Sequence, residues 1–210
     1  MARVLLADDH PLFRQALRAA VMLAQPDLAV EEAGTLQTAC AALKAKRDYV
    51  LILLDLKMPD CGGLFGLLTM TSEAPQLPIV VVSANENPDA INSVMALGAA
   101  GFIPKSASVH EISQALIAVL KGDLCAPALT PRLSVPVVVD NLASLTPTQL
   151  RILTALHRGL PNKRIAFEMG IAEGTVKAHI SVIFRKLNVS NRTQLLVVTR
   201  SLMLDDAPAA

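Results

Sequence analysis

Five polar side chains in the N-terminal half of the chain stand at or just after the ends of apolar runs. They are Asp8, Asp9, Asp55, Ser83 and Lys105. Three carboxylates held close together repel one another unless a cation lies between them, and clustered carboxylate oxygens with room for water suit Mg²⁺. With a lysine to neutralise an anion and a hydroxyl to donate a hydrogen bond, this set has the groups needed to transfer a phosphoryl group onto Asp55.

Each of these residues has a purely structural explanation when it is taken alone. Aspartate and serine commonly cap helices or stand in turns, and a lysine that follows a proline is usually solvated. A carboxylate beside an apolar run loses solvation, however, and needs a partner or a purpose. The joint placement of all five after four separate apolar runs therefore favours one shared site.

The surrounding segments predict the elements that would bring these side chains together. Short apolar runs typical of buried strands occupy residues 2–7, 28–33, 49–54, 77–84 and 101–104. Apolar residues spaced by three and four predict helices at residues 11–24, 36–46, 63–73, 88–98 and 108–122. Five such units make an α/β fold with a doubly wound, five-stranded parallel sheet of flavodoxin-like order. Because its strands share one carboxyl edge, the five polar side chains should converge on a crevice there.

Composition indicates a globular protein that does not span a membrane. Of the 210 residues 52% are hydrophobic and 18% charged, and no apolar run reaches the roughly 18 residues of a membrane span. Asp8 and Asp9 interrupt the first apolar run too early for a secretory signal, so we expect a cytoplasmic protein. Cys40, Cys61 and Cys125 are far apart and lack the spacing of metal ligands, so they predict neither a disulfide framework nor a zinc site.

Charge is divided unevenly along the chain. Residues 1–123 hold nine Lys and Arg against thirteen Asp and Glu, a net charge of −4, whereas residues 144–200 hold nine against two, a net charge of +7. Residues 124–143 contain three prolines without helical periodicity and are expected to be a linker, and residues 201–210 a C-terminal tail. Two domains with different partners are predicted, and the basic one is a candidate for binding nucleic acid.

Four stretches of the first domain resemble the receiver domain of bacterial two-component response regulators. They are "LLADDHPLFRQAL", "LLDLKMPDCGG", "VVVSA" and "GAAGFIPKSAS", and the D-L-x-M-P-x-x-x-G pattern from Asp55 to Gly63 is highly specific. The resemblance covers about residues 1–123. It implies that Asp55 accepts a phosphoryl group from a phosphohistidine of a sensor kinase. It also implies that Mg²⁺ is held by Asp8, Asp9, Asp55 and the backbone carbonyl of Lys57.

The same resemblance assigns roles to residues around the acceptor. Lys105 would contact the phosphoryl group, and its peptide bond to Pro104 would be cis. Ser83 and Phe102 would form a switch pair, in which the hydroxyl moves toward the phosphoryl group and the ring swings inward. The side chain of Lys57 could reach over the site and add positive charge, although simple solvation explains it equally well.

The basic region has the pattern of a helix-turn-helix. Amphipathic segments at residues 145–159, 161–170, 172–187 and 190–200 are separated by glycine, proline and polar residues, and the middle two have the required spacing. The apolar stripe of the third segment is Val176, Ile180, Ile183 and Leu187. The opposite face holds Ala178, Ser181 and Arg185, with Lys177 and Lys186 on its flanks. Such a helix can enter a major groove, and a solvated face on an ordinary bundle is the alternative.

This region resembles the LuxR-type helix-turn-helix of the NarL/FixJ class of response regulators, from about Leu145 to Thr199. The resemblance rests on "LTP", "GLPNKRIA", "GTVKAHI" and "RKLNVSNRTQ". It implies that Lys177, Ala178 and Ser181 face base edges. Residues that it implies near phosphates are Asn162, Lys163, Thr175, Arg185 and Arg192.

Together the patterns predict a transcription factor and not an enzyme. Its parts are a receiver at residues 1–123, a linker at 124–143, a helix-turn-helix domain at 144–200 and a tail at 201–210. Phosphorylation by a sensor histidine kinase would favour a homodimer and binding to double-stranded DNA, with no membrane partner. The alternatives are an aspartyl-phosphate hydrolase, which usually has an aspartate where Lys57 stands, and a nucleotide-binding module, although no glycine-rich phosphate loop follows the first strand. A LuxR-type regulator that works without phosphorylation is the third.

Overall fold

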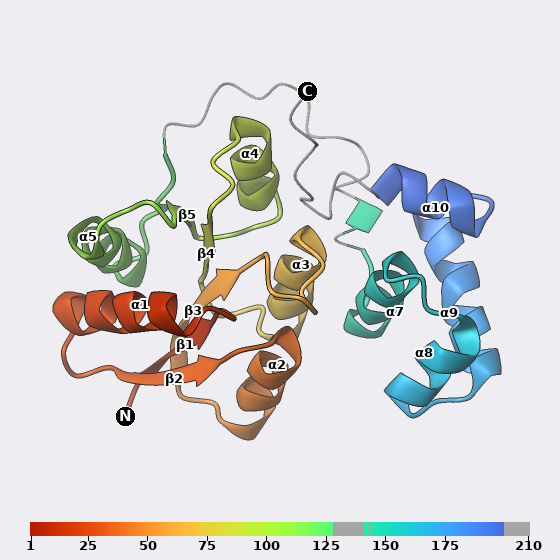
Figure 1. Cartoon of the computed structure of the whole chain (residues 1–210), viewed down its shortest axis with the longest axis horizontal. Helices are drawn as coiled ribbons and strands as arrows, with labels where there is room; N and C mark the ends of the chain where they lie inside the picture. The colour runs from red at the N-terminus through yellow and green to blue at the C-terminus, as the bar shows by residue number, and fades with distance from the viewer. Residues whose placement is uncertain (128–140, 143, 200–210) are drawn as a thin grey trace.

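The structure, a computed structural model, describes residues 1–127, 141–142 and 144–199. Strands alternate with helices in its N-terminal part, and its C-terminal part is helical (Figure 1). The strands are β1 Arg3–Ala7, β2 Ala29–Ala33, β3 Tyr49–Asp55, β4 Ile79–Ser83 and β5 Gly101–Pro104. Their helices are α1 Pro11–Ala24, α2 Leu36–Ala45, α3 Leu64–Glu73, α4 Pro88–Ala96 and α5 Val109–Leu120. These elements confirm the predicted alternation, with small differences at their ends.

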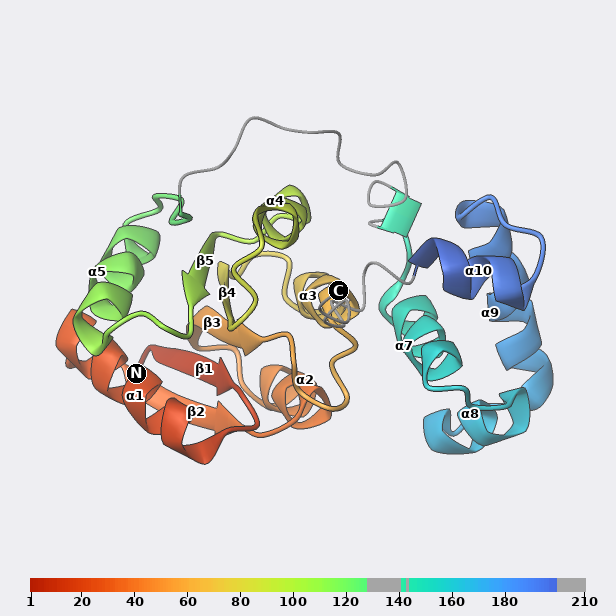
Figure 2. The same ribbon diagram turned by 45° about the horizontal axis from the view of Figure 1, so that its top comes forward.

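The strands form one parallel sheet in the order β2-β1-β3-β4-β5, which confirms the flavodoxin-like, doubly wound fold. Helices α1 and α5 lie on one face, and α2, α3 and α4 lie on the other (Figures 1 and 2). Leu51 and Leu53 of β3 belong to the core on the α1 side, whereas Ile52 and Leu54 belong to the core on the α3 side. All four are fully buried, as expected of a strand covered on both faces.

The cis peptide bond implied between Pro104 and Lys105 is wrong, because no peptide bond of the described residues is cis. The tertiary amide of a proline is the bond before it, here from Ile103. The bond to Lys105 is an ordinary secondary amide, for which the cis form costs about 2.5–4 kcal/mol. The Lys105 backbone N–H donates to the Ser83 carbonyl at 2.9 Å and so fixes the end of β5 beside the end of β4.

The segment that follows α5 stays attached to the sheet. The Phe102 N–H donates to the Cys125 carbonyl at 2.7 Å, and the Cys125 N–H donates to the Ala100 carbonyl at 3.1 Å. Cys125 thereby forms a parallel bridge with Gly101 on the open side of β5. The first residues of the predicted linker are therefore part of the receiver surface, and residues 128–140 and 143 of that linker lie outside the described residues.

In the part of the C-terminal domain that the structure describes there are four helices. They are α7 Pro147–His157, α8 Asn162–Met169, α9 Glu173–Lys186 and α10 Arg192–Thr199. Thr146 and Gln149 form a capping box at the start of α7, and Gly170 ends α8 in the left-handed conformation with φ +65°. Residue 200 and the predicted tail lie outside the described residues. No helix in the part of the chain that the structure describes is long and apolar enough to cross a membrane.

Candidate phosphoacceptor site and nucleic-acid interface

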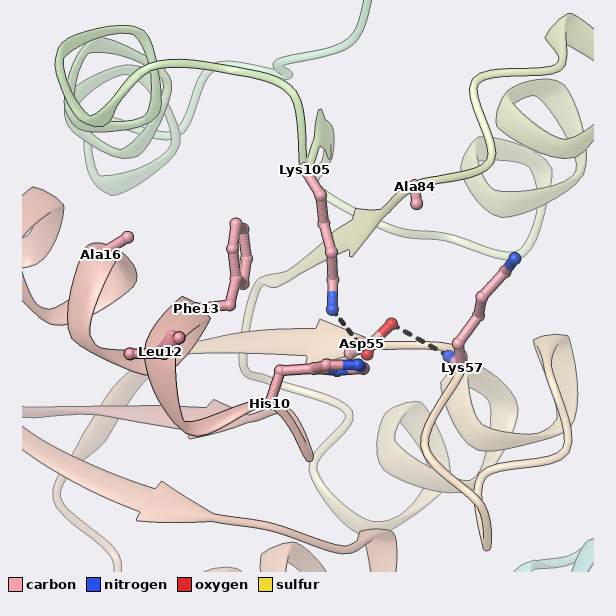
Figure 3. Close-up of a pocket in the computed structure, with 8 residues that line it drawn as sticks. All are labelled: His10, Leu12, Phe13, Ala16, Asp55, Lys57, Ala84 and Lys105. Atoms are coloured by element: carbon pink, nitrogen blue, oxygen red, sulfur yellow. Dashed lines mark hydrogen bonds and ion pairs between the residues drawn. The ribbon is translucent and has the colours of Figure 1, made fainter.

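An acidic pocket forms at the carboxyl edge of the sheet, as predicted (Figure 3). Asp8 and Asp55 are almost completely buried, and Lys105 Nζ lies 2.7 Å from Asp8 Oδ2 and 2.8 Å from Asp55 Oδ2. One carboxylate oxygen each from Asp8, Asp9 and Asp55 and a ring nitrogen of His10 lie within 4.8 Å of one another. Receiver domains bind Mg²⁺ at an acidic pocket, and this chain gathers three carboxylates there.

Backbone groups orient the buried carboxylates. Asp55 Oδ1 accepts a hydrogen bond from the Lys57 N–H at 2.9 Å, and Asp8 Oδ1 accepts one from the His10 N–H at 2.7 Å. Asp8 Oδ2 and Asp9 Oδ1 are buried without a hydrogen bond, although the former is ion-paired with Lys105 and the latter lies 2.8 Å from His10 Nδ1. Buried anionic oxygens of this kind are stabilised by a nearby cation.

Lys105 is held in its charged form. Burial by itself would lower the pKa of this lysine, but the hydrogen bond to Asp55 and the ion pair with Asp8 outweigh burial and raise the pKa above its ordinary value. Lys105 Nζ also lies 4.8 Å from the centroid of the Phe13 ring, a cation–π distance. The sequence analysis did not single out Phe13, because an aromatic residue in an amphipathic helix is ordinarily explained by core packing.

A pocket of about 510 Å³ opens beside Asp55 (Figure 3). Its lining residues are His10, Leu12, Phe13, Ala16, Asp55, Lys57, Ala84 and Lys105. One wall, from α1, is apolar, and the other carries the acceptor and two lysines. The side chain of Lys57 is directed away from Asp55, so only its backbone N–H faces the acceptor (Figure 3).

The predicted switch residues lie on the two strands next to the acceptor strand. Ser83 ends β4 and is 2% exposed, and its Oγ accepts a hydrogen bond from the Asn85 N–H at 3.1 Å. Phe102 lies on β5 and is also 2% exposed, within the core cluster that includes Val94 of α4. In this structure the ring already stands inside. The switch roles of Ser83 and Phe102 stay a prediction.

Asp60 is a polar residue of the acceptor loop that the sequence analysis missed. Its two carboxylate oxygens accept hydrogen bonds from the Leu36 and Gln37 N–H groups, each at 2.9 Å. Asp60 therefore accepts from the first two N–H groups of α2, in addition to the Thr35 N-cap, and ties the β3–α3 loop to that helix. No local pattern could have revealed this contact, because the helix start and the aspartate are 24 residues apart.

Helix α9 has the two faces that its sequence predicts. Val176, Ile183 and Leu187 are buried, and Ile180 is partly buried against the same core. The exposed residues proposed to meet DNA on this helix are Thr175, Lys177, Ala178, Ser181 and Arg185. With α8 before it, α9 occupies the recognition position of a helix-turn-helix.

Several of the predicted DNA contacts also bond within the domain. Lys177 Nζ pairs with Glu173 at 2.9 Å, and Ser181 Oγ donates to the Lys177 carbonyl at 3.1 Å. Arg192 donates to the carbonyls of Leu156 and Leu160, each at 3.1 Å, and so ties α10 to the end of α7. Asn162 and Lys163 stand at the start of α8, half-buried and exposed, where backbone N–H groups favour an anion.

The two domains touch through α3 and α7, which lie side by side in both views (Figures 1 and 2). The rings of Phe65 and His157 have centroids 5.4 Å apart, and His157 Nε2 lies 2.6 Å from Thr199 Oγ1 of α10. Gly62, with φ +66°, leaves so little room that a Cβ there would lie 2.9 Å from Thr154 Cγ2. The contact does not cover the predicted DNA-reading face of α9, whose residues remain exposed.

Comparisons with known proteins agree with both halves of the molecule. Two family models match, the response regulator receiver domain over residues 4–117 and the luxR family of bacterial regulatory proteins over residues 143–199. The glycerol metabolism activator of Pseudomonas putida is 38% identical over 208 residues, which cover 94% of each chain. The nitrate/nitrite response regulator NarL of Escherichia coli (strain K12) is 30% identical over 203 residues, 93% of this chain and 94% of NarL.

Solved structures of response regulators match one part of the chain or nearly all of it. A LuxR family DNA-binding response regulator from Silicibacter pomeroyi matches with a TM-score of 0.54 at 30% identity, over 61% of this chain and 98% of that one. The response regulator RcsB, in its complex with DNA, matches with a TM-score of 0.53 at 25% identity, over 96% of this chain and 98% of RcsB.

Fold, site and comparisons define a two-component response regulator with a DNA-binding output domain, a transcription regulator and not an enzyme. Within that class, the chain belongs to the NarL-type family, which joins a receiver to a LuxR-type helix-turn-helix. The predicted family, fold class and function are confirmed. No observation favours a regulator that works without phosphorylation.

Proposed function

We propose that this chain accepts a phosphoryl group on Asp55 from a sensor histidine kinase and thereby controls its own pairing on double-stranded DNA. The observation that carries this proposal is the setting of Asp55. The residue is 1% exposed, and its carboxylate is oriented by the Lys57 N–H, paired with Lys105 Nζ and placed beside a pocket that can admit a phosphodonor.

The transfer needs one bond to form and one to break. A carboxylate oxygen of Asp55 attacks the phosphorus of a phosphohistidine, the P–N bond breaks, and its electron pair leaves on the imidazole nitrogen, which then takes a proton. Lys105, now between Asp8 and Asp55, stabilises the charge on the phosphoryl oxygens. Ser83 Oγ, which here accepts from the Asn85 N–H, turns to donate to a phosphoryl oxygen.

The acidic pocket fits Mg²⁺ as its cofactor. Asp9 Oδ1 is buried without a hydrogen bond and Asp8 Oδ2 has only its ion pair with Lys105, and carboxylate oxygens suit a hard cation. The proposed ligands are these two residues, Asp55 and the backbone carbonyl of Lys57. When bound, the ion neutralises negative charge on the phosphoryl group and on the carboxylates that surround it.

An apolar stripe on α1 offers the kinase a place to dock. Leu12 is 80% exposed and Leu23 is 61% exposed, and Ala16 and Ala19 lie between them at helical spacing. Leu12 and Ala16 also line the acceptor pocket. A partner helix packed along this stripe would bring a phosphohistidine to the mouth of the pocket, which supports a kinase of helical architecture as the phosphodonor.

The DNA-reading surface of the proposal is the exposed face of α9. Lys177, Ala178 and Ser181 read base edges, and the +7 charge of residues 144–200 supplies affinity for the phosphate backbone. The residues assigned to phosphates are Asn162, Lys163, Thr175, Arg185 and Arg192. RcsB, a structural neighbour of this chain, is solved in a complex with DNA, which supports this role. We place the protein with the chromosome, in the cytoplasm.

Phosphorylation is proposed to favour a homodimer. A two-fold symmetric pair of helix-turn-helix units matches paired half-sites, and pairing two weak binders raises affinity through effective concentration. The receiver at residues 1–123, the linker at 124–143, the DNA-binding domain at 144–200 and the tail at 201–210 are the units of this proposal. Either the face around α4 and α5 or the released C-terminal domain supplies the contact between copies.

Labelling with acetyl phosphate and Mg²⁺, followed by intact mass, tests the acceptor. We expect Asp55→Asn to abolish the addition of one phosphoryl group and Asp9→Asn to weaken it by impairing Mg²⁺ binding. Asp27→Asn, which changes an exposed aspartate between α1 and β2, is the matched control and should label like the parent. Undiminished labelling of Asp55→Asn would place the acceptor elsewhere.

A further inference from the structure

The open edge of β5 carries a backbone contact that phosphoryl transfer does not use. We call the two hydrogen bonds between Cys125 and β5, from the Phe102 N–H and to the Ala100 carbonyl, the linker bridge. Strand β5 ends the sheet order, so among the described residues only Cys125 pairs with this side of it. The bridge therefore decides whether these two backbone groups bond to protein or to water.

Gly101 is fitted to the linker bridge. A Cβ at this position would lie 2.7 Å from the Cys125 carbonyl oxygen, closer than real Cβ contacts come. Gly101 is not among the glycines with positive φ, so its backbone conformation does not require glycine. Glycine is required because a larger side chain has no space beside Cys125. Cys125 is itself partly buried against the core on the α1 side, while Leu124 before it is 74% exposed.

The linker bridge includes the backbone of Phe102, the predicted switch residue. Phe102 supplies the N–H of the shorter hydrogen bond, at 2.7 Å, and its register partner on β4 is Val81, two residues before Ser83. Because the ring already stands inside and the bond uses the backbone N–H, it is a shift of the β5 backbone at Phe102 that reaches Cys125 without an intervening residue. Residues 124–127 also begin the covalent connection between the receiver and the DNA-binding domain.

We propose that the linker bridge is a conformational device that holds the start of the linker on β5 until Asp55 is phosphorylated. The modification acts through Ser83 and Phe102 and loosens the bridge, so the inference rests on the proposed switch. Release of residues 124–127 lengthens the free connection by up to roughly 14 Å, at about 3.4 Å per extended residue. The added reach lets the DNA-binding domain leave its contact with α3 and meet a second copy.

Gly101→Ala tests the bridge without any phosphodonor. Its matched control is Gly34→Ala, where a Cβ would have only an ordinary 3.9 Å contact with Arg14. Amide hydrogen exchange of Phe102 is the readout, because Cys125 supplies its acceptor. We expect exchange at least tenfold faster in Gly101→Ala and unchanged in Gly34→Ala. Cys125→Pro removes the backbone N–H that donates to the Ala100 carbonyl, and should also accelerate exchange of the Phe102 amide. If the Phe102 amide exchanges as slowly in both bridge variants as in the parent, the inference is overturned.

Beryllofluoride with Mg²⁺, added to the full parent chain, tests the link to Asp55. Fluorine NMR shows whether beryllofluoride is bound, independently of the linker. Once it is bound, we expect exchange of Phe102 and alkylation of Cys125 to rise severalfold. Bound beryllofluoride with unchanged exchange would overturn the bridge as a switch and leave the acceptor assignment standing. No bound signal at saturating concentrations would overturn the acceptor assignment and the proposed coupling together.

Discussion

Replacing Gly62 by alanine perturbs the contact between the acceptor loop and the DNA-binding domain. Gly62 has φ +66°, and an alanine in the left-handed region costs about 1–2 kcal/mol. Its Cβ would also lie 2.9 Å from Thr154 Cγ2 of α7, and overpacking of this kind costs about 1–3 kcal/mol. We therefore expect Gly62→Ala to lower the free energy of unfolding by about 2–5 kcal/mol if the domains stay in contact.

Two further variants separate these contributions. Gly98 has φ +88°, and a Cβ added there would have no atom within 4 Å. The loss of unfolding free energy in Gly98→Ala should therefore come from the backbone conformation alone. Thr154→Ser removes Cγ2 but keeps the Oγ1 that donates to the Leu150 carbonyl at 3.0 Å. In the background of Gly62→Ala, it should restore about 1–3 kcal/mol, a coupling that a double-mutant cycle measures.

The chain is suited to this measurement because it has no tryptophan and one tyrosine. Tyr49 is 5% exposed in β3, so its fluorescence during urea unfolding follows the receiver, while circular dichroism follows both domains. Small-angle scattering shows whether the DNA-binding domain instead separates from the receiver in Gly62→Ala. Separation would limit the loss of unfolding free energy to what the contact between the two domains contributes. A loss equal to that of Gly98→Ala, without domain separation and without rescue by Thr154→Ser, would refute the packing of α7 on Gly62.

Other parts of the molecule give three more predictions. Asp60→Ala should lower the free energy of unfolding by about 1–2 kcal/mol because the Leu36 and Gln37 N–H groups of α2 lose their acceptors, and an unchanged urea midpoint would contradict that role. Lys177→Ala should reduce the free energy of binding to a specific DNA site by about 1–3 kcal/mol. Lys163→Ala should instead weaken binding to all DNA sequences alike and flatten the salt dependence of that binding, which titrations at several salt concentrations would show. Hydrogen bonds from Arg18 and then Arg14 lower the pKa of Glu32 in the folded protein below its usual 4.5. The contribution of Glu32 to the stability of the fold is therefore complete above pH 4.5 and is lost as the pH falls through the lowered pKa of the folded protein. The Tm of Glu32→Gln should therefore fall less steeply below pH 4.5 than that of the parent, and parallel curves would exclude this contribution.

Local pattern was sufficient to predict most of the fold. The strands are buried on both faces and therefore appear as continuous apolar runs, as in β3, and the helices keep a regular apolar spacing, as in α9. The convergence of Asp8, Asp55 and Lys105 followed from the shared carboxyl edge of a parallel sheet, which topology fixes once the strands are known.

Contacts between residues distant in sequence could not be predicted in this way. Asp60 capping α2 depends on the path of a loop, and the bond from Cys125 to β5 depends on where the chain turns after α5. The packing of Gly62 against Thr154 involves two domains whose sequences carry no shared periodicity. Rotamer states are equally hidden, so the inward position of the Phe102 ring came only with the structure.

The open face of α9 has a consequence for how quickly a cell could respond. Because the receiver leaves this face uncovered, an unsignalled copy can hold the phosphate backbone weakly and slide along it. The regulator population would then already be spread over the chromosome when a stimulus arrives. The search for a promoter would become one-dimensional, and under the proposed dimerisation the delay before transcription changes would be set by how soon two neighbouring copies meet on the same stretch of DNA.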